Sequence, residues 1–195
     1  MSDLWREPDG ATPLTPDERE GLIQAWIGTR GELNEAEQAN IARATAWARR
    51  RRRTGLLTDS FARMLHLRMF NDVWSWAGEF RRTDKNIGID WRKIPMEFPA
   101  ILSDARYWIE HHSYASDEIA VRLHHRIVAI HPFPNGNGRH ARLFADLLET
   151  ELGGTSFTWG SQDLAPTGEV RKRYILALKA ADNHDIAPLL EFARS

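Results

Sequence analysis

Apolar residues recur at helical spacing along most of the chain, and breaks in that spacing mark the ends of the predicted helices. Leu65, Met69 and Val73, for example, would lie on one face of a helix. The segment Thr15-Pro16-Asp17-Glu18 is a capping box with proline at the first helical position, which predicts a helix start. The predicted helices cover about residues 15–28, 34–53, 58–74, 95–112, 117–130, 138–152, 168–182 and 187–194.

One stretch departs from this helical pattern. Residues 80–94 mix β-branched and aromatic side chains with turn-forming residues, namely Asp84, Asn86, Gly88 and Asp90. Such a composition is typical of a short hairpin or an extended loop. The sequence therefore predicts a mainly α fold with one small β-hairpin.

The composition is that of a globular protein of 195 residues, with 42% hydrophobic and 27% charged residues. The chain has no cysteine, which excludes disulfides and thiolate chemistry. The polar N-terminus lacks the apolar core of a signal peptide, and no apolar run approaches the roughly 18 residues of a membrane span. We therefore expect a cytoplasmic protein without membrane contact.

The charge pattern gives little reason to expect a nucleic-acid partner. The net charge is −1, so any basic patch must be local. The one candidate is the run Arg49–Arg53, which could contact phosphates. A solvated helix end is the more common role of such a run, so we do not expect nucleic acid to bind.

The segment from His131 to Arg142 combines residue types that suit phosphate chemistry. Gly136-Asn137-Gly138 precedes a predicted helix, and a glycine-rich turn that opens a helix points backbone N–H groups at one spot, which favours an anion. Arg139 and Arg142 are three residues apart and share one face of the first turn, where each can bind phosphate oxygens. His131 has the usual pKa of a general base near neutral pH, about 6.5. The structural alternative is a surface turn followed by a core helix with two solvated arginines.

The same segment resembles the signature of the Fic family, H-x-F-x-(D/E)-G-N-G-R-x-x-R, with Asn135 as its one departure. The segment Trp74–Arg81 resembles the family's W-A-G-x-x-R stretch, and Tyr174–Phe192 resembles its closing helices. The resemblance implies a Fic-type helical bundle over residues 55–195, preceded by an N-terminal helical segment, residues 1–54. The whole chain resembles the Fic subgroup called mobile mystery protein B.

Fic proteins usually transfer AMP from ATP to a hydroxyl of a target protein, so the resemblance implies a protein adenylyltransferase. His131 would deprotonate the Ser, Thr or Tyr hydroxyl of the target. Arg139 would bind the β-phosphate region and stabilise the transition state, and Arg142 would hold the γ-phosphate. The anion hole around the α- and β-phosphates would be formed by Gly136, Asn137 and Gly138.

The departure at Asn135 concerns the metal. The family normally has Asp or Glu there to hold Mg²⁺, and an amide oxygen supplies no negative charge. We expect weak Mg²⁺ binding at Asn135, and either the rate or the donor could differ. Transfer of UMP, GMP, phosphocholine or phosphate stays open, as does a catalytically weak nucleotide-binding regulator. A regulator would have no use for His131, which favours the enzyme.

Two further segments have counterparts in the family. Ile87, Gly88 and Ile89 would form the flap that pairs with the backbone of the target, although a plain connecting hairpin is equally compatible with them. Gly28–Asn34 resembles the family's inhibitory motif, (S/T)-x-x-x-E-(G/N), in which a glutamate pairs with the second motif arginine. Glu32 would then pair with Arg142, despite two departures from the motif, although an ordinary loop carboxylate is the alternative. An antitoxin-like partner protein is a further prediction.

Overall fold

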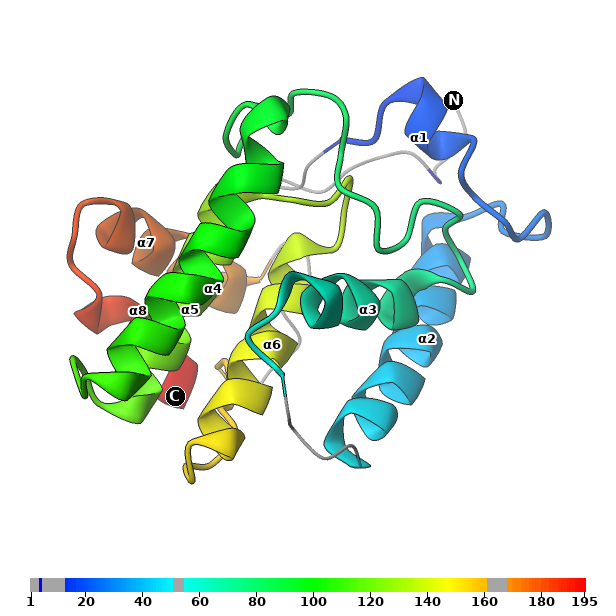
Figure 1. Cartoon of the computed structure of the whole chain (residues 1–195). Coiled ribbons are helices and arrows are strands. Elements are labelled where there is room, and N and C mark those ends of the chain that lie inside the picture. The colour runs from blue at the N-terminus through cyan, green and yellow to red at the C-terminus, as the bar shows by residue number, and fades with distance from the viewer. Residues whose placement is uncertain (1–3, 5–12, 51–54, 161–167) are drawn as a thin grey trace.

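The computed structural model describes residue 4 and residues 13–50, 55–160 and 168–195, and these residues are mainly helical (Figure 1). A 3-10 turn, η2, covers Trp91–Lys93. The helices are α1 Pro16–Arg19, α2 Arg30–Arg50, α3 Asp59–Phe70, α4 Ile94–Glu110, α5 Ser116–Ile130, α6 Asn137–Glu151, α7 Glu169–Asp182 and α8 Ala187–Arg194. The mainly α fold is confirmed, and α3 to α8 begin within about two residues of the predicted positions.

Helix α6 lies at the centre of the bundle (Figure 1). It packs against α5 on one side and against α2 and α3 on the other, while α4 covers α5 and α8 closes the far side of α5. The core between these helices consists of fully buried apolar side chains, among them Leu65, Phe98, Ile127, Phe144 and Leu189. Burying such faces stabilises the bundle by about 25 cal/mol per Å² of apolar surface. The packing places the start of α6 beside the end of α5.

Helix α2 starts earlier than predicted, at Arg30 instead of Asn34. The reason is a capping box at Thr29. The Thr29 hydroxyl accepts a hydrogen bond from the Glu32 N–H at 3.3 Å, and the Glu32 carboxylate accepts one from the Thr29 N–H at 2.9 Å. Arg49 and Arg50 end the helix. The rest of the arginine run falls within residues 51–54, which lie outside the described residues.

The first predicted helix is much shorter than expected, because α1 ends at Arg19. Beyond it the chain pairs with the segment after α3. The Ile23 N–H donates to the Val73 carbonyl at 2.9 Å, and the Ser75 N–H donates to the Gly21 carbonyl at 2.9 Å. A Cβ atom on Gly21 would lie 2.4 Å from the Trp76 ring. The glycine therefore serves close packing between distant segments, which local periodicity does not reveal.

The structure does not contain the predicted β-hairpin, and this prediction is corrected here. No strand occurs in the described part of the chain, and residues 82–90 form bends and extended chain. The backbone groups that a hairpin would pair with each other have other partners. The Thr83 and Ile89 carbonyls accept hydrogen bonds from the Arg81 side chain, and the Ile89 N–H donates to the Ile130 carbonyl at 3.4 Å. In the described residues, no helix is long and apolar enough to cross a membrane.

Candidate active site

His131 stands at the C-terminal end of α5 in a left-handed backbone conformation, with φ 54° and ψ 60°. Its N–H still donates to the Ile127 carbonyl at 3.0 Å, so the residue caps the helix. Pro132 follows and cannot continue the helix. The side chain is nearly enclosed, with 6% of the residue exposed. A non-glycine residue in this conformation is strained by about 1–2 kcal/mol, so the surroundings must hold it there.

The surroundings also set the charge of the imidazole. Burial, followed by the positive charges of Arg81 and Lys85, lowers the pKa of His131 to about 4. A hydrogen bond to the Val128 carbonyl acts in the opposite direction and is outweighed. The ring is therefore neutral at physiological pH and able to accept a proton. That state is the one a general base requires.

The loop after His131 is anchored in the core. The Phe133 ring is fully buried and stacks on His66, with 3.7 Å between ring centroids. The Asn137 side chain closes the loop, because it accepts from the Phe133 N–H at 2.9 Å and donates to the Phe133 carbonyl at 2.8 Å. The side chain of Asn137 thus holds the loop. Only its backbone N–H can take part in the predicted anion hole.

The start of α6 has the features of an anion site. Gly136 precedes the helix with φ 78°, and a Cβ atom there would lie 2.5 Å from the Phe70 ring, so glycine is required. No described side chain caps the first turn of α6. The first N–H groups of the helix therefore keep their capacity to bind an anion, which the helix dipole also favours.

Arg142 lies one turn into α6 and stands beside the same spot. A Cβ atom on Gly138 would lie 3.9 Å from both the Arg142 Nη1 atom and the Tyr174 hydroxyl. The Arg142 guanidinium lies 5.6 Å from the centre of the Tyr174 ring, and His124 bonds the Tyr174 hydroxyl at 3.0 Å. Within the described residues Arg142 makes no ion pair with a carboxylate. Tyr174 and, without a direct ion pair, Asp146 stabilise its charge among these residues, so the guanidinium can still bind an incoming anion.

Residues 56–148 match the sequence model of the family described as Fic/DOC family. This part of the chain is therefore similar to a Fic domain. Two proteins named "Protein adenylyltransferase Fic", from Drosophila grimshawi and Drosophila melanogaster, are each 30% identical to the chain over 119 residues. This stretch is 60% of the chain and 23% of each relative, so the chain spans about a quarter of the length of these curated relatives.

Solved structures show the same fold. The BepC protein of Bartonella tribocorum, crystallised with bound AMPPNP, gives a TM-score of 0.67 at 16% identity, over 92% of this chain and 97% of that one. A Fic domain containing signaling protein from Bacteroides thetaiotaomicron gives a TM-score of 0.61 at 20% identity, over 83% of this chain and 66% of that one. At these identities the likeness establishes the fold alone.

The first arginine of the Fic motif is already paired in this structure. The Arg139 Nη1 atom lies 2.6 Å from the Glu37 carboxylate, and the guanidinium also lies over the Phe70 ring. Glu37 is 4% exposed and accepts a second hydrogen bond from the Trp74 indole at 2.7 Å. A carboxylate on an arginine fork competes with phosphate for the same donors. Arg139 can therefore serve as a phosphate ligand only after Glu37 releases it or shares it.

Glu37 is a site residue that the sequence analysis missed, although the sequence carries a signal for it. The apolar face of α2 consists of residues at helical spacing, and Glu37 occupies one of its positions. The buried residues of this helix are Leu33, Glu37, Asn40, Ala44 and Ala48. A carboxylate on a buried face needs a partner. Here that partner is a motif arginine.

Glu32, in contrast, does not reach the Fic motif, which corrects the predicted pairing with Arg142. Its carboxylate accepts hydrogen bonds from the Gly28 and Thr29 N–H groups, both at 2.9 Å, and from the Thr29 hydroxyl at 3.0 Å. These bonds, the Gly28 N–H first, lower the pKa of Glu32. Glu32 is the glutamate of the capping box that Thr29 opens at the start of α2. It is engaged by its own helix end instead of by an arginine of the site.

Asn135 offers a poor site for Mg²⁺. Its Oδ1 atom accepts a hydrogen bond from the Gly136 N–H at 2.6 Å and lies 3.5 Å from an Arg139 nitrogen. A neutral oxygen directed at two donors does not fit a divalent cation, which prefers charged oxygens. In the part of the chain that the structure describes, no group of three or more His, Cys, Asp or Glu residues could hold a metal ion.

The predicted flap lies against the general-base candidate. A Cβ atom on Gly88 would lie 2.7 Å from the His131 Cβ atom, so the flap backbone touches the histidine directly. Ile89 continues along the end of α5 through its hydrogen bond to Ile130. Ile87 is 43% exposed and faces outward. Of the three predicted flap residues, two therefore pack on the site and one is available to a partner.

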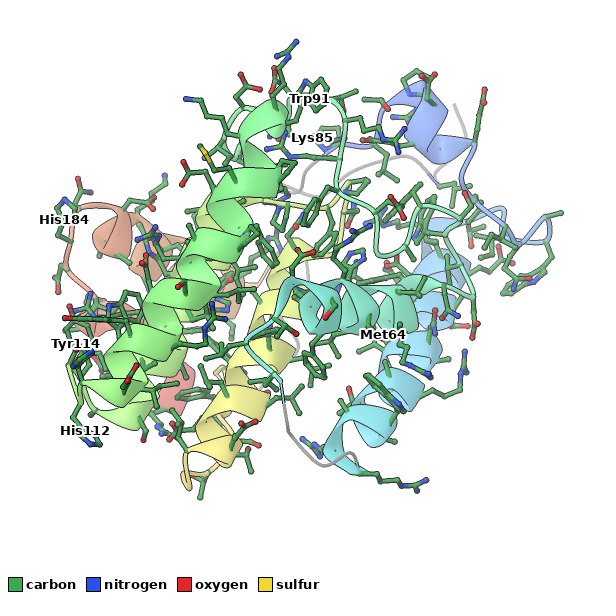
Figure 2. The ribbon with its side chains drawn as sticks, viewed as in Figure 1. Met64, Lys85, Trp91, His112, Tyr114 and His184 are labelled. Atoms are coloured by element: carbon green, nitrogen blue, oxygen red, sulfur yellow. The ribbon has the colours of Figure 1, made fainter. Side chains whose placement is uncertain are left out.

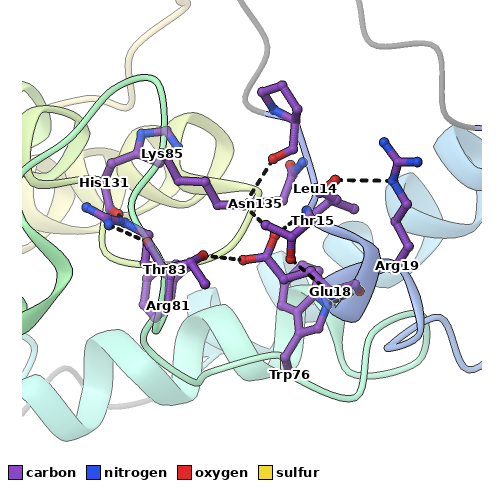
Figure 3. Close-up of polar contacts among 12 residues, drawn as sticks. Leu14, Thr15, Glu18, Arg19, Trp76, Arg81, Thr83, Lys85, His131 and Asn135 are labelled. Carbon is purple, nitrogen blue, oxygen red and sulfur yellow. Dashed lines mark hydrogen bonds and ion pairs between the residues drawn. The ribbon is translucent and has the colours of Figure 1, made fainter.

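The segment with α1 holds the flap from the other side (Figure 3). Lys85 forms an ion pair with Glu18 and donates to the Pro13 carbonyl at 3.0 Å, and the Thr83 hydroxyl bonds Glu18 at 3.3 Å. Figure 2 shows Lys85 and Trp91 near the N-terminal end of α4, where the flap joins that helix. The side chain of Lys85 is 3% exposed. The N-terminal segment thus adds to the enclosure of the site.

Proposed function

We propose that this protein is a Fic-type protein adenylyltransferase, in which residues 55–195 act as the Fic domain and residues 1–54 as an N-terminal helical segment. The observation that carries the proposal is the neutral His131 beside the uncapped start of α6 and an Arg142 side chain that, among the described residues, forms no ion pair with a carboxylate. The names of the Drosophila relatives support the reaction, and the AMPPNP in the Bartonella structure supports an adenine nucleotide as the ligand.

The reaction needs few steps from the protein. The oxygen of a Ser, Thr or Tyr hydroxyl on the target attacks the α-phosphorus of ATP, and His131 accepts the hydroxyl proton. The bond between the α-phosphorus and the oxygen that bridges it to the β-phosphorus breaks, and pyrophosphate leaves. The helix start and Arg142 stabilise the negative charge of the phosphates, which is the main electrostatic contribution to such a transfer.

Mg²⁺ bound to the nucleotide would neutralise phosphate charge when present. The residues of this chain contribute little to holding it, because Asn135 supplies only a neutral oxygen that already accepts a hydrogen bond. Within the motif, binding of the triphosphate therefore relies on backbone N–H groups and arginines. An antitoxin-like partner stays a prediction from the family resemblance.

The proposal is tested with ATP labelled at the α-phosphate. The purified protein is incubated with a cell lysate, and labelled proteins are identified by mass spectrometry. We expect addition of AMP by the wild type and a loss of at least about 100-fold in His131→Ala, because a positioned general base contributes about 10²–10⁴-fold. With γ-labelled ATP, the wild type should add no more label to protein than His131→Ala does, because the γ-phosphate leaves with pyrophosphate. Tight ATP binding without transfer would favour a nucleotide-binding regulator, for which the pairing of Arg139 with Glu37 is the relevant observation.

A further inference from the structure

Arg81 is buried directly behind the general-base candidate, although it belongs to a segment 50 residues away in the sequence. Its side chain is 0% exposed. The guanidinium donates from Nε to the His131 carbonyl at 2.7 Å and from Nη2 to the Ile130 carbonyl at 3.3 Å. The Arg81 N–H donates to the Pro132 carbonyl at 2.9 Å. Arg81 therefore binds the backbone on both sides of the left-handed residue, as Figure 3 shows for His131.

The same guanidinium also binds the flap. Nη1 donates to the Thr83 carbonyl at 2.8 Å, and Nη2 donates to the Ile89 carbonyl. Gly88 packs against the Arg81 Nη2 atom, where a Cβ atom would lie 2.9 Å away. One rigid planar group thus connects the flap with the end of α5. Lysine could not reproduce this arrangement, since it lacks the fork of donors.

The position of the Arg81 guanidinium does not depend on an ion pair with a carboxylate. Among the described residues, Arg81 forms an ion pair with Asp84, at 3.9 Å, and the Asp84 side chain is 65% exposed. Because water screens the exposed carboxylate, this pair contributes little to stability. The directional contacts of the guanidinium are instead the backbone carbonyls of two segments. That arrangement fixes the relative position of two pieces of chain.

We propose that Arg81 is a positioning residue that sets the place of His131 relative to the flap on which the target docks. The inference rests on the proposed function, since it concerns the alignment of the target hydroxyl with the imidazole. Without Arg81, the strained backbone at His131 loses its restraint, and the flap can shift against α5. A displacement of about 1 Å of a reacting group can lower a rate by about 100-fold.

The charge of Arg81 gives the proposal a second, independent observable. Arg81 contributes to the lowered pKa of His131, second only to burial. The other charged groups around the pair are Lys85 of the flap, which acts on His131, and Asp84, Asp90 and Glu18, which act on Arg81. Removal of the guanidinium should therefore raise the pKa of His131 towards its usual value. Burial persists in the variant, so the pKa should stay below 6.5.

The test compares Arg81→Met and Arg81→Lys with the matched control Arg63→Met. Arg63 also donates from Nε to a loop carbonyl, that of Gly78 at 2.9 Å, and lies over an aromatic ring, but it does not contact His131. For each protein we would measure the pKa of His131 by NMR, the Kd for ATP by calorimetry, and kcat and KM for labelling from α-labelled ATP. Thermal melts show whether each variant is folded.

We expect Arg81→Met to raise the pKa of His131 and to lower kcat by about 100-fold, with little change in the Kd for ATP. Arg81→Lys keeps the charge and loses the fork, so it should leave the pKa near that of the wild type and still lower kcat. Arg63→Met should change neither. An unchanged pKa and kcat in both Arg81 variants would overturn the proposal.

The NMR arm of the test does not depend on catalysis, and the second variant covers a failure of the first to fold. If the wild type transfers nothing, the proposed function fails while the NMR titration still shows whether Arg81 acts on His131. If Arg81→Met does not fold, Arg81→Lys tests whether Arg81 positions His131 relative to the flap. A normal kcat in folded Arg81→Lys would then contradict this role.

Discussion

The residues of the site have properties that their neighbours in space impose. His131 is neutral because it is buried beside Arg81 and Lys85, and it keeps a left-handed backbone where α5 ends. Arg142 lies next to an aromatic hydroxyl, whereas Arg139, one turn away on the same helix, is paired with Glu37. Two arginines that look equivalent in the sequence motif are therefore chemically different. Arg142 is ready for an anion and Arg139 is not.

This difference leads to a prediction for Glu37→Gln. The amide keeps an acceptor for the Trp74 indole and removes the charge that competes for Arg139. We expect the Kd for ATP to fall by about tenfold, within the usual range of coupling between two competing ligands. Isothermal titration calorimetry measures it directly. The labelling rate should rise as well.

Glu32→Gln is the matched control, because Glu32 lies on the same helix and bonds only its own end. Loss of its charge should weaken the cap and lower the free energy of unfolding, which a urea denaturation curve measures. ATP binding should not change. If Glu37→Gln binds ATP no better than the wild type while Glu32→Gln binds it better, the assignment of the two glutamates is wrong.

At the scale of the elements, the helices that depend on local signals could be predicted from the sequence. Helices α4 to α8 follow their apolar periodicity, and the Thr58 cap marks the start of α3. The glycine-rich turn before α6 was also predicted, together with the position of His131 before it. Each of these features is determined within a few residues of chain.

The predictions that were wrong concern elements whose structure depends on contacts between distant parts of the sequence. Helix α3 ends at Phe70 instead of residue 74, where the Asn40 side chain bonds the Arg68 carbonyl and the Asp72 N–H, both at 2.9 Å. The expected hairpin is a loop because Arg81 and Ile130 take its backbone partners. The role of Arg81 was equally hidden, although the residue stands in the W-A-G-x-x-R stretch. Its partners at the end of α5 lie about 50 residues further along the chain.

At the scale of the whole molecule, buried histidines make stability depend on pH. Burial, as the largest cause, lowers the pKa of His131 and His140 to about 4 and that of His124 to about 3. In the unfolded chain a histidine has a pKa of about 6.5, so unfolding takes up protons between about pH 6.5 and 4. Asp146 acts in the opposite direction, because burial raises its pKa to about 6.

Burial also lowers the pKa of His66. Four histidines outweigh one aspartate, so the folded state should be most stable near neutral pH and lose stability as the pH falls. Each net proton taken up on unfolding lowers the free energy of unfolding by about 1.4 kcal/mol per pH unit. Urea denaturation between about pH 7 and 4.5 measures this slope. A variant such as His140→Gln should have a smaller slope than the wild type. A free energy of unfolding that stays constant or rises towards acid pH would contradict the protonation states described for the core.

The central claim is that the end of α5, the start of α6 and Arg142 form one binding site for a nucleoside triphosphate, with His131 at its edge. The most direct measurement is a crystal structure of the protein with AMPPNP. We predict phosphate oxygens within hydrogen-bond distance of the first N–H groups of α6 and of the Arg142 guanidinium, with His131 facing the α-phosphorus. A nucleotide bound elsewhere, or phosphates that leave Arg142 uncontacted, would contradict the account.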